Sequence, residues 1–324
     1  MTLKEWTHEA RLRARMVSQP FRRAPKSVGW MVGSGRSGTT WLSSLLNADC
    51  TMREVFEPVH VLHVERMKGA TTHPAWSEDP TWDAWLTDVF RGRHITRRTD
   101  RDNVGRNPAG AHKLLVKDVF ATGLLSSPVA QGVSKVLVMR HPVAVALSKQ
   151  AHRHWHWVWS TEEFLNHPTW RDGMLSPWVD TLSKVNQEGS EMERLVAVWA
   201  VIQRISLMSL PADELPVIHY ERAVQDPWGE VVALKENRGW DVLISASESE
   251  VMAAAGRVSF VSKSADTASL PNPSRWMQSV PGEDRVRAEK LLIQLGMADW
   301  HDDQGMPVPG TIQSWREAHA PPRR

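Results

Sequence analysis

A glycine-rich stretch at residues 33–40 constrains the fold more than any other part of the sequence; its letters are GSGRSGTT. The apolar run at 27–32 before it is typical of a buried strand. Residues 38–46 after it place large apolar side chains at helical spacing. Glycines let a backbone turn tightly with its N–H groups pointing inward, and the start of a helix adds partial positive charge. The pattern therefore predicts a strand, a phosphate-binding loop and a helix in succession.

The charge of this loop separates it from the loops of nucleoside triphosphatases. Gly33 and Gly38 have the Gly-x4-Gly spacing of a nucleotide-binding P-loop, but Thr39 replaces the lysine that follows in such loops. The positive side chain lies inside the loop instead, at Arg36. A Walker-type loop needs its lysine at the terminal phosphates, so a P-loop nucleotide kinase or NTPase is only the alternative function. The alternative for the loop itself is a tight turn without a ligand.

Strand and helix patterns alternate along most of the chain. The sequence predicts further strands at 52–56, 112–117, 135–139 and 215–219. It predicts helices at 81–90, 142–151 and 283–295, and two between 176 and 210 that are separated near Gly189. Such alternation is typical of a parallel sheet with helices on both faces. We therefore expect an α/β fold, a single domain with a central parallel sheet flanked by helices.

The ends of the chain differ from this domain, which we place at residues 27–300. Residues 1–26 form a basic N-terminal arm that includes Arg13, and we expect it to be a solvated lead-in. Contact with an anionic lipid, ligand or partner is the alternative for this arm. The tail at 301–324 contains four prolines, so we expect it to be irregular.

A second anion-binding pair follows the predicted strand 135–139. Arg140 lies at the end of this strand, and Ser148 comes eight residues later in the predicted helix. Eight residues make about two helical turns, so the hydroxyl can face the same group as the guanidinium. The arginine fork suits a phosphate dianion. For Arg140 alone, a surface salt bridge is the alternative.

These two motifs resemble those of the sulfotransferases that use 3'-phosphoadenosine-5'-phosphosulfate (PAPS). The resemblance implies that Arg36 contacts the transferred sulfuryl group and that the loop holds the 5'-phosphate. It also implies that Trp41 packs near the adenine, that Arg140 and Ser148 hold the 3'-phosphate, and that PAPS is the co-substrate. The cofactor-binding residues so implied are Gly35, Arg36, Ser37, Gly38, Thr39, Thr40, Trp41, Arg140, Ser148, Phe260 and Arg275.

Three looser stretches extend the resemblance over residues 28–295. Residues 217–221, followed by Asp226 and Pro227, are similar to a family strand that ends in Tyr-Glu, and we interpret them as structural. Phe260 lies in a stretch that resembles the family segment whose aromatic residue flanks the adenine. Arg275 lies in a stretch that resembles a C-terminal basic segment closing over the 3'-phosphate.

By the same resemblance, the catalytic residues are Arg36, Glu57 and Lys117. Sulfuryl transfer is an in-line displacement that depends on positioning and on cations. Arg36 and Lys117 are the candidates for stabilising the charge that grows on the leaving nucleotide, and we expect no metal to be required. Lys117 lies in a stretch similar to the Leu-Lys-Asp of carbohydrate sulfotransferases. A structural pair with Asp118 or another acid is the alternative for this lysine.

The acceptor hydroxyl needs a general base. The base histidine of cytosolic family members would fall at Val119, whereas Glu57 resembles the glutamate of the Glu-Pro pair in carbohydrate sulfotransferases. Partial burial would raise the pKa of this carboxyl toward neutrality and make it a better base. A local salt bridge is the alternative for Glu57, and His60 and His63 are the next candidates for the base.

Two segments of unusual composition are candidates for the acceptor side. Residues 152–159 alternate histidine and tryptophan, and His152 and His156 have helical metal-ligand spacing without a convincing third ligand. We expect a packed helix surface there, with an acceptor wall that includes Trp155 as the alternative. The arginine-rich segment at 91–110 is expected to be a solvated loop; gating the site or binding an anionic acceptor is the alternative. The candidate substrate-binding residues are Glu57, His60 and Trp155.

Composition excludes several other classes of protein. Lys+Arg number 39 against 37 Asp+Glu, and this balance argues against a module that binds nucleic acid through bulk charge. The single Cys50 excludes an internal disulfide framework and a multi-thiolate metal site. We find neither a secretory signal nor an apolar run that could span a membrane, so we expect a cytoplasmic protein. The 17 tryptophans indicate a deep apolar core or an aromatic cleft.

The sequence thus favours a PAPS-dependent O-sulfotransferase that releases adenosine 3',5'-bisphosphate. Its expected partner is a small-molecule or glycan acceptor: a carbohydrate, a glycolipid or a hydroxylated small molecule. A homo-oligomer is compatible with the sequence.

Overall fold

A five-stranded parallel sheet forms the centre of the structure. The structure is a computed structural model, and it describes residues 24–60, 73–100, 103, 112–152, 158–256 and 272–319, with residues 7, 10, 13 and 14. Its strand order is β2-β3-β1-β4-β5, and all neighbouring strands run parallel. The strands are β1 (Ser27–Gly33), β2 (Met52–Phe56), β3 (Lys113–Asp118), β4 (Ser134–Met139) and β5 (Val217–His219). The predicted α/β class is confirmed, and no predicted strand boundary is wrong by more than two residues.

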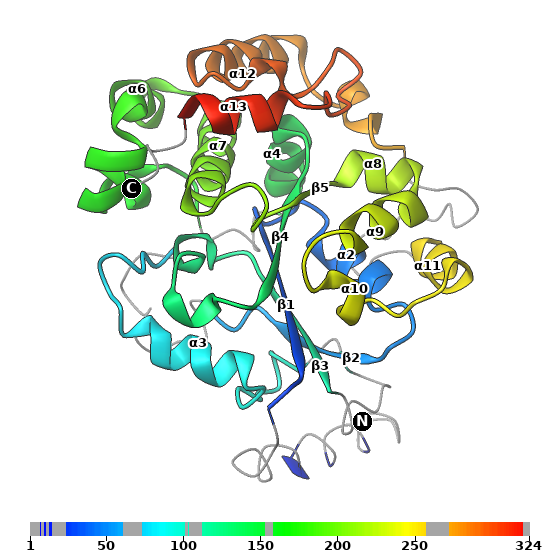
Figure 1. Cartoon of the computed structure of the whole chain (residues 1–324). Helices are drawn as coiled ribbons and strands as arrows, with labels where there is room; N and C mark the ends of the chain where they lie inside the picture. The colour runs from blue at the N-terminus through cyan, green and yellow to red at the C-terminus, as the bar shows by residue number, and fades with distance from the viewer. Residues whose placement is uncertain are drawn as a thin grey trace.

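Helices surround this sheet, and Figure 1 shows α12 and α13 next to α7. The helices of the described residues are α2 (Thr39–Leu46), α3 (Trp82–Phe90), α4 (Pro142–Ala151), α5 (Glu162–Leu165), α6 (Val179–Glu188), α7 (Glu191–Ser209), α8 (Tyr220–Gln225), α9 (Pro227–Lys235), α10 (Trp240–Leu243), α11 (Glu248–Ala255), α12 (Gly282–Gln294) and α13 (Thr311–His319). The predicted break between two helices near Gly189 is confirmed, and Ser190 begins α7 with a capping box.

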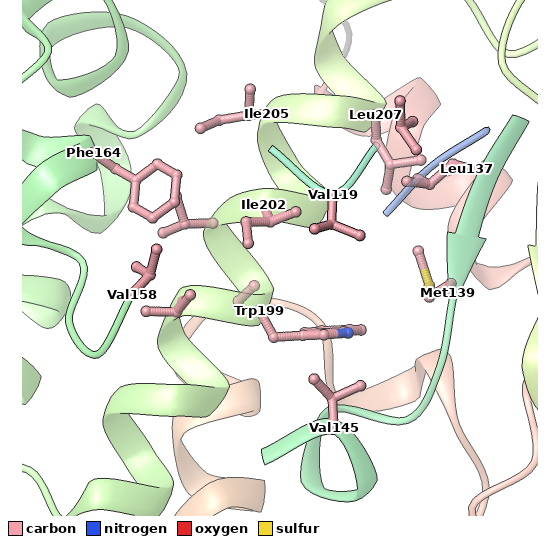
Figure 2. Packing of buried hydrophobic residues seen from close by; sticks show 14 of the residues in the cluster. Val119, Leu137, Met139, Val145, Val158, Phe164, Trp199, Ile202, Ile205 and Leu207 are labelled. Atoms are coloured by element: carbon pink, nitrogen blue, oxygen red, sulfur yellow. The ribbon is translucent and has the colours of Figure 1, made fainter. Parts of the chain in front are cut away.

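The alternation of side chains along the strands divides the core into two clusters. Trp30 and Val32 of β1 pack with α3, α4 and α7 on one face of the sheet. Met31 packs with α2, α9, α10 and α11 on the other face. Figure 2 shows part of the first cluster, which includes the fully buried Trp199 of α7 and Met139 at the end of β4. Both faces of the sheet are therefore covered, as a parallel sheet requires.

Most of the tryptophans that the structure describes belong to this core. Those that are buried are Trp30, Trp41, Trp82, Trp170, Trp178, Trp199, Trp240, Trp276, Trp300 and Trp315. The high tryptophan content therefore reflects large apolar side chains between sheet and helices, one of the two interpretations that the sequence allowed. Within the described part of the chain, no helix combines the length and the apolar character that a membrane span needs.

The expectation of an irregular tail at 301–324 is wrong for residues 311–319, which form α13. Ile312, Trp315 and Arg316 are buried at spacings of three and four residues, so one face of this helix meets the core. Trp315 packs edge-on against Trp300 with ring centroids 5.4 Å apart. The prolines that predicted irregular structure lie on either side of α13 and leave its interior free of helix breakers.

Candidate active site

The glycine-rich loop joins β1 to α2 at the carboxyl edge of the sheet, as predicted. Gly38, just before α2, has a left-handed φ of 89°, and a Cβ on it would lie 2.4 Å from the Tyr220 ring. Arg36 also has a positive φ, 74°, which is unusual for a residue with a side chain. No described side chain caps the start of α2, so the first N–H groups of this helix have no side-chain partner among the described residues.

Arg36, Ser148, Arg140 and Tyr220 meet beside this loop, and we call them the Arg36 cluster. Arg36 donates from Nε to the Ser148 hydroxyl at 2.9 Å. Arg140 donates from Nη1 to the carbonyl oxygen of Arg36 at 3.3 Å, and its guanidinium lies over the Tyr220 ring, 4.5 Å from the centroid. The structure thus brings together the two motifs that the sequence analysis singled out separately.

The Arg36 cluster carries two guanidinium charges. Burial raises the pKa of the nearby Glu221 carboxyl to about 7, and the charge of Arg140 acts against this rise. Burial lowers the pKa of Arg36, and the charge of Arg140 lowers it further. Within the part of the chain that the structure describes, neither arginine forms a salt bridge with a carboxylate. Two buried donor atoms here, Ser37 Oγ and Arg140 Nε, have no hydrogen-bond partner among the described residues. Buried polar atoms are rarely left unpaired, so the cluster is suited to an anionic ligand with several acceptor oxygens.

Trp41 contributes to the wall of this region rather than to its charge. Its ring packs edge-on against Tyr220, with centroids 5.6 Å apart, and its indole N–H donates to the Ala255 carbonyl at 3.3 Å. The side chain is thereby fixed between α2 and α11. The predicted contact of Trp41 with an adenine stays a prediction, because its predicted partner Phe260 lies outside the described residues.

Lys117 approaches the loop from the neighbouring strand β3. Its Nζ donates to the Thr40 hydroxyl at 3.1 Å and lies 4.4 Å from the centroid of the Phe56 ring. The side chain is only 1% exposed. Asp118, the next residue, accepts from the backbone N–H groups of Val59 and Phe120. Because successive side chains alternate across a strand, Lys117 and Asp118 point to opposite faces of the sheet.

Glu57 directly follows β2 and has a positive φ of 42°. Its Oε2 accepts from Arg98 Nη2 at 2.7 Å and lies 3.9 Å from His60 Nε2. The local salt bridge that the sequence left as an alternative is therefore present. An arginine partner favours the ionised carboxylate. The assignment of Glu57 as general base stays a prediction.

Aromatic rings connect Glu57 to a second histidine. The His60 ring packs edge-on against Phe120, whose ring centroid is 5.5 Å from that of His73. We call Phe56, Glu57, His60, His73, Arg98 and Phe120 the Glu57 cluster. Arg98 and His73 were not singled out individually by the sequence analysis. Arg98 belongs to the arginine-rich segment, but nothing local in the sequence distinguishes it from its neighbours.

Asp118 is a further titratable group that the sequence analysis assigned only as a partner of Lys117. Burial raises the pKa of this carboxyl to about 7, against the effect of its two backbone hydrogen bonds, and the charge of Glu57 raises it further. The side chain is fully buried, between the segment after β2 and the segment after β3. Its hydrogen bonds to the Val59 and Phe120 N–H groups therefore connect the segment after β2, which carries Glu57, to the end of β3, which carries Lys117.

A shallow pocket of about 270 Å³ lies beside the Glu57 cluster. Trp159, Glu163 and other polar residues line it, and Glu163 Oε1 is 2.8 Å from His73 Nδ1. Trp155, the predicted acceptor-wall residue, lies outside the described residues, as do His63 and His156. The neighbouring Trp159 is the described aromatic residue of that segment.

Arg275 begins a short 3-10 helix and is exposed, whereas the adjacent Trp276 stacks on His141 with ring centroids 4.2 Å apart. This stack holds the segment against the start of α4, next to Arg140. The structure shows no hydrogen bond between Arg275 and the described residues of the Arg36 cluster. Its predicted contact with a phosphate stays a prediction.

No protein-family model matches the chain. No curated protein sequence matches it either.

Several solved structures have a similar fold. The sulfotransferase domain from the curacin biosynthetic pathway is 16% identical over 85% of this chain and 99% of its own length, with a TM-score of 0.41. The sulfotransferase from Alicyclobacillus acidocaldarius is 16% identical over 85% and 94%, with a TM-score of 0.38. Retinol dehydratase, in complex with androsterone and the inactive cofactor PAP, is 13% identical over 92% and 88%, with a TM-score of 0.38. At such values, nothing about this chain's substrate or reaction follows from these likenesses.

Proposed function

We propose that this chain is a sulfotransferase, which transfers a sulfuryl group from PAPS to an acceptor hydroxyl and releases adenosine 3',5'-bisphosphate. The observation that carries this proposal is the Arg36 cluster. Arg140 is close enough to Arg36 to lower its pKa, and neither arginine forms a salt bridge with a carboxylate among the described residues. A ligand with a phosphate at each end would neutralise both arginines.

The two phosphate positions of such a ligand correspond to two parts of the cluster. The loop and the start of α2 supply N–H groups and Arg36 for the 5'-phosphosulfate. Arg140 and Ser148 supply a guanidinium and a hydroxyl for the 3'-phosphate. Arg36 is hydrogen-bonded to Ser148, so the two positions adjoin. The unpartnered Ser37 Oγ and Arg140 Nε would find acceptors on the same ligand.

Lys117 and Arg36 are the candidates for stabilising the leaving nucleotide. In the transfer, the acceptor oxygen forms a bond to sulfur while the bond from sulfur to the bridging phosphate oxygen breaks. Negative charge then grows on that bridging oxygen, where nearby cations are most effective. The Thr40 hydroxyl and the face of the Phe56 ring contact Lys117 and position it at the loop.

Glu57 is the candidate for accepting the proton of the acceptor hydroxyl. A carboxylate must be ionised to act as a base, and Arg98 at 2.7 Å stabilises that form and fixes the side chain. His60 Nε2 lies 3.9 Å from the same oxygen and is the second candidate for the base. The proton leaves the hydroxyl as its oxygen bonds to sulfur, so the sulfate ester product forms without a separate alkoxide.

We place the acceptor in the pocket that adjoins the Glu57 cluster. Trp159 and the polar residues of the adjoining pocket suit a ring with several hydroxyl groups, because aromatic faces stack on such rings and polar groups orient them. We therefore propose a carbohydrate, a glycolipid or a hydroxylated small molecule as the acceptor. The pocket does not distinguish among these three classes.

Thermal unfolding in the presence of nucleotides tests the proposal. Adenosine 3',5'-bisphosphate should raise the melting temperature by mass action, and ATP with magnesium should raise it much less. Ser148→Ala should reduce the shift, whereas the exposed Arg287→Ala on α12 should not. A shift with magnesium-ATP and none with the bisphosphate would instead identify a kinase or NTPase.

A further inference from the structure

Three side chains that commonly ligate metals meet next to the Arg36 cluster. His219 ends β5, Glu221 lies in the first turn of α8, and His301 follows the short 3-10 helix Ala298–Trp300. One ligand atom from each of the three lies within 4.8 Å of the others. The sheet edge and the C-terminal region thus converge on one point, although His301 is far from the other two in sequence.

Each of these side chains has a buried polar atom without a hydrogen-bond partner among the described residues. The atoms are His219 Nδ1, Glu221 Oε2 and His301 Nε2. Glu221 is fully buried, and its other oxygen accepts from the His141 backbone N–H at 2.8 Å. The three residues thus meet at one point, and each has an unpartnered buried polar atom. Buried polar groups are nearly always paired, so this arrangement indicates a missing ligand.

The chemistry of the three groups fits a metal ion. Each histidine has a ring nitrogen, and Glu221 a carboxylate oxygen, that no described residue occupies. Two histidine nitrogens and one carboxylate oxygen are typical zinc ligands.

We propose that His219, Glu221 and His301 bind a zinc ion, with water in the fourth position. Zinc–ligand distances are about 2.0–2.2 Å, so binding would draw the most distant pair of ligand atoms together by no more than about 1.4 Å. His219 and Glu221 flank Tyr220, whose ring lies under Arg140. The ion would thus attach the segment of His301 to the turn that supports Arg140. The site takes no part in sulfuryl transfer and does not depend on the proposed function.

Metal retention by the full-length chain tests this site. The protein is incubated with zinc sulfate and desalted, and zinc is then measured by mass spectrometry. We expect about one zinc per chain for the wild type and loss of the bound zinc in His301→Gln and Glu221→Gln. Glutamine at position 221 keeps an oxygen for the His141 N–H, so the local hydrogen bond survives. The matched control is His319→Gln, an exposed histidine on α13, which should retain the zinc.

Cobalt binding provides a second readout, which uses the wild-type chain alone and therefore does not depend on whether a variant folds. Cobalt bound to the wild type in a four-coordinate site should give visible absorption bands, and added zinc should remove them. A wild-type chain that retains no zinc and gives no such bands would overturn the proposal and favour a buried water at this point. Equal zinc retention by wild type and His301→Gln would also overturn it.

Discussion

The arginines of the Arg36 cluster and the arginine of the Glu57 cluster have different kinds of partner. Arg36 and Arg140 contact a hydroxyl, a carbonyl and an aromatic ring, but no carboxylate among the described residues. Arg98 contacts Glu57 at 2.7 Å. An arginine that is already paired gains little from a further anion, whereas two neighbouring unpaired arginines gain much. The Arg36 cluster is therefore suited to bind an anion, and the Glu57 cluster to hold a neutral group and accept a proton.

Phe56 connects the Glu57 cluster with Lys117, which contacts the glycine-rich loop. Lys117 Nζ is 4.4 Å and the Arg98 guanidinium 5.1 Å from the centroid of its ring. One of these cations faces the loop through Thr40, and the other faces Glu57. The difference between the clusters predicts a division of labour: substitutions in the Arg36 cluster should change nucleotide affinity, and substitutions in the Glu57 cluster should change turnover.

The largest effect is expected for Glu57→Gln. Without the carboxylate, transfer should fall by about 10²–10⁴-fold, the usual contribution of a general base, while the Kd for adenosine 3',5'-bisphosphate stays unchanged. Steady-state kinetics and calorimetry measure the two quantities. Glu78→Gln is the matched control, because Glu78 also pairs with a histidine, His167 at 2.6 Å, but lies outside both clusters. Transfer near the wild-type rate would exclude Glu57 as the base.

The next largest effect is expected for Arg140→Ala. Hydrogen bonds to charged groups contribute about 1.5–3 kcal/mol, so the affinity for the bisphosphate should fall by about 10–150-fold. Ser148→Ala removes a neutral hydroxyl and should cost less, about 2–10-fold. Calorimetric titration checks both values. If Arg140→Ala binds the bisphosphate as tightly as the wild type, the Arg36 cluster is not the phosphate site and the contrast between the clusters fails.

Sequence patterns predicted the parts of the site that depend on local spacing. The loop, Arg140 and Ser148 were found because a strand end, a helix start and two helical turns leave regular patterns. The same holds for the strands, since apolar runs mark them whatever their position in the sheet. The helix α13 was missed because prolines flank it, although its buried residues have helical spacing.

Contacts between segments that are distant in the sequence could not be predicted from local spacing. Arg36 and Ser148 meet because β1 and β4 are neighbours in the sheet, and Glu57 meets Arg98 because the chain after α3 returns to the end of β2. No local pattern distinguishes Arg98 from several nearby arginines. These partners depend on strand order and on loop paths, which no local spacing encodes.

A smaller effect is expected for Gly38→Ala, which tests how the loop supports the Arg36 cluster. Any alanine with left-handed φ costs about 1–2 kcal/mol of stability. At Gly38 the added Cβ would also lie 2.4 Å from the Tyr220 ring and displace the platform under Arg140. Gly132→Ala is the matched control, with a φ of 80° and no atom within 4 Å of a Cβ. Denaturant unfolding should show a greater loss for Gly38→Ala, and only this variant should bind the bisphosphate more weakly.

The smallest effect on the proposed activity is expected from Asp118, which should give a pH dependence of stability. Burial raises the pKa of this carboxyl from 3.8 to about 7, so the folded chain binds a proton that the unfolded chain releases. The contribution of Asp118 to stability is therefore greatest below pH 4, falls as the pH rises from about 4 to about 7, and is constant above that. Asp118→Asn should remove this slope in urea unfolding measured across the range. Other buried carboxyls contribute to both curves, so parallel curves for the two chains would refute the assignment.

Urea unfolding of Arg98→Met across the same pH range tests the contrast between the two clusters. The charge of Glu57 raises the pKa of Asp118, and the charge of Arg98 lowers it by a smaller amount. At Asp118, Arg98 thus offsets the charge of Glu57 only in part. Arg36 and Arg140, in contrast, form no salt bridge with any described carboxylate. Removing the guanidinium should raise the pKa of Asp118 further and extend the falling limb of stability to higher pH. An unchanged limb would mean that the charge of Arg98 does not act on Asp118, and would refute the partial compensation of Glu57 by Arg98.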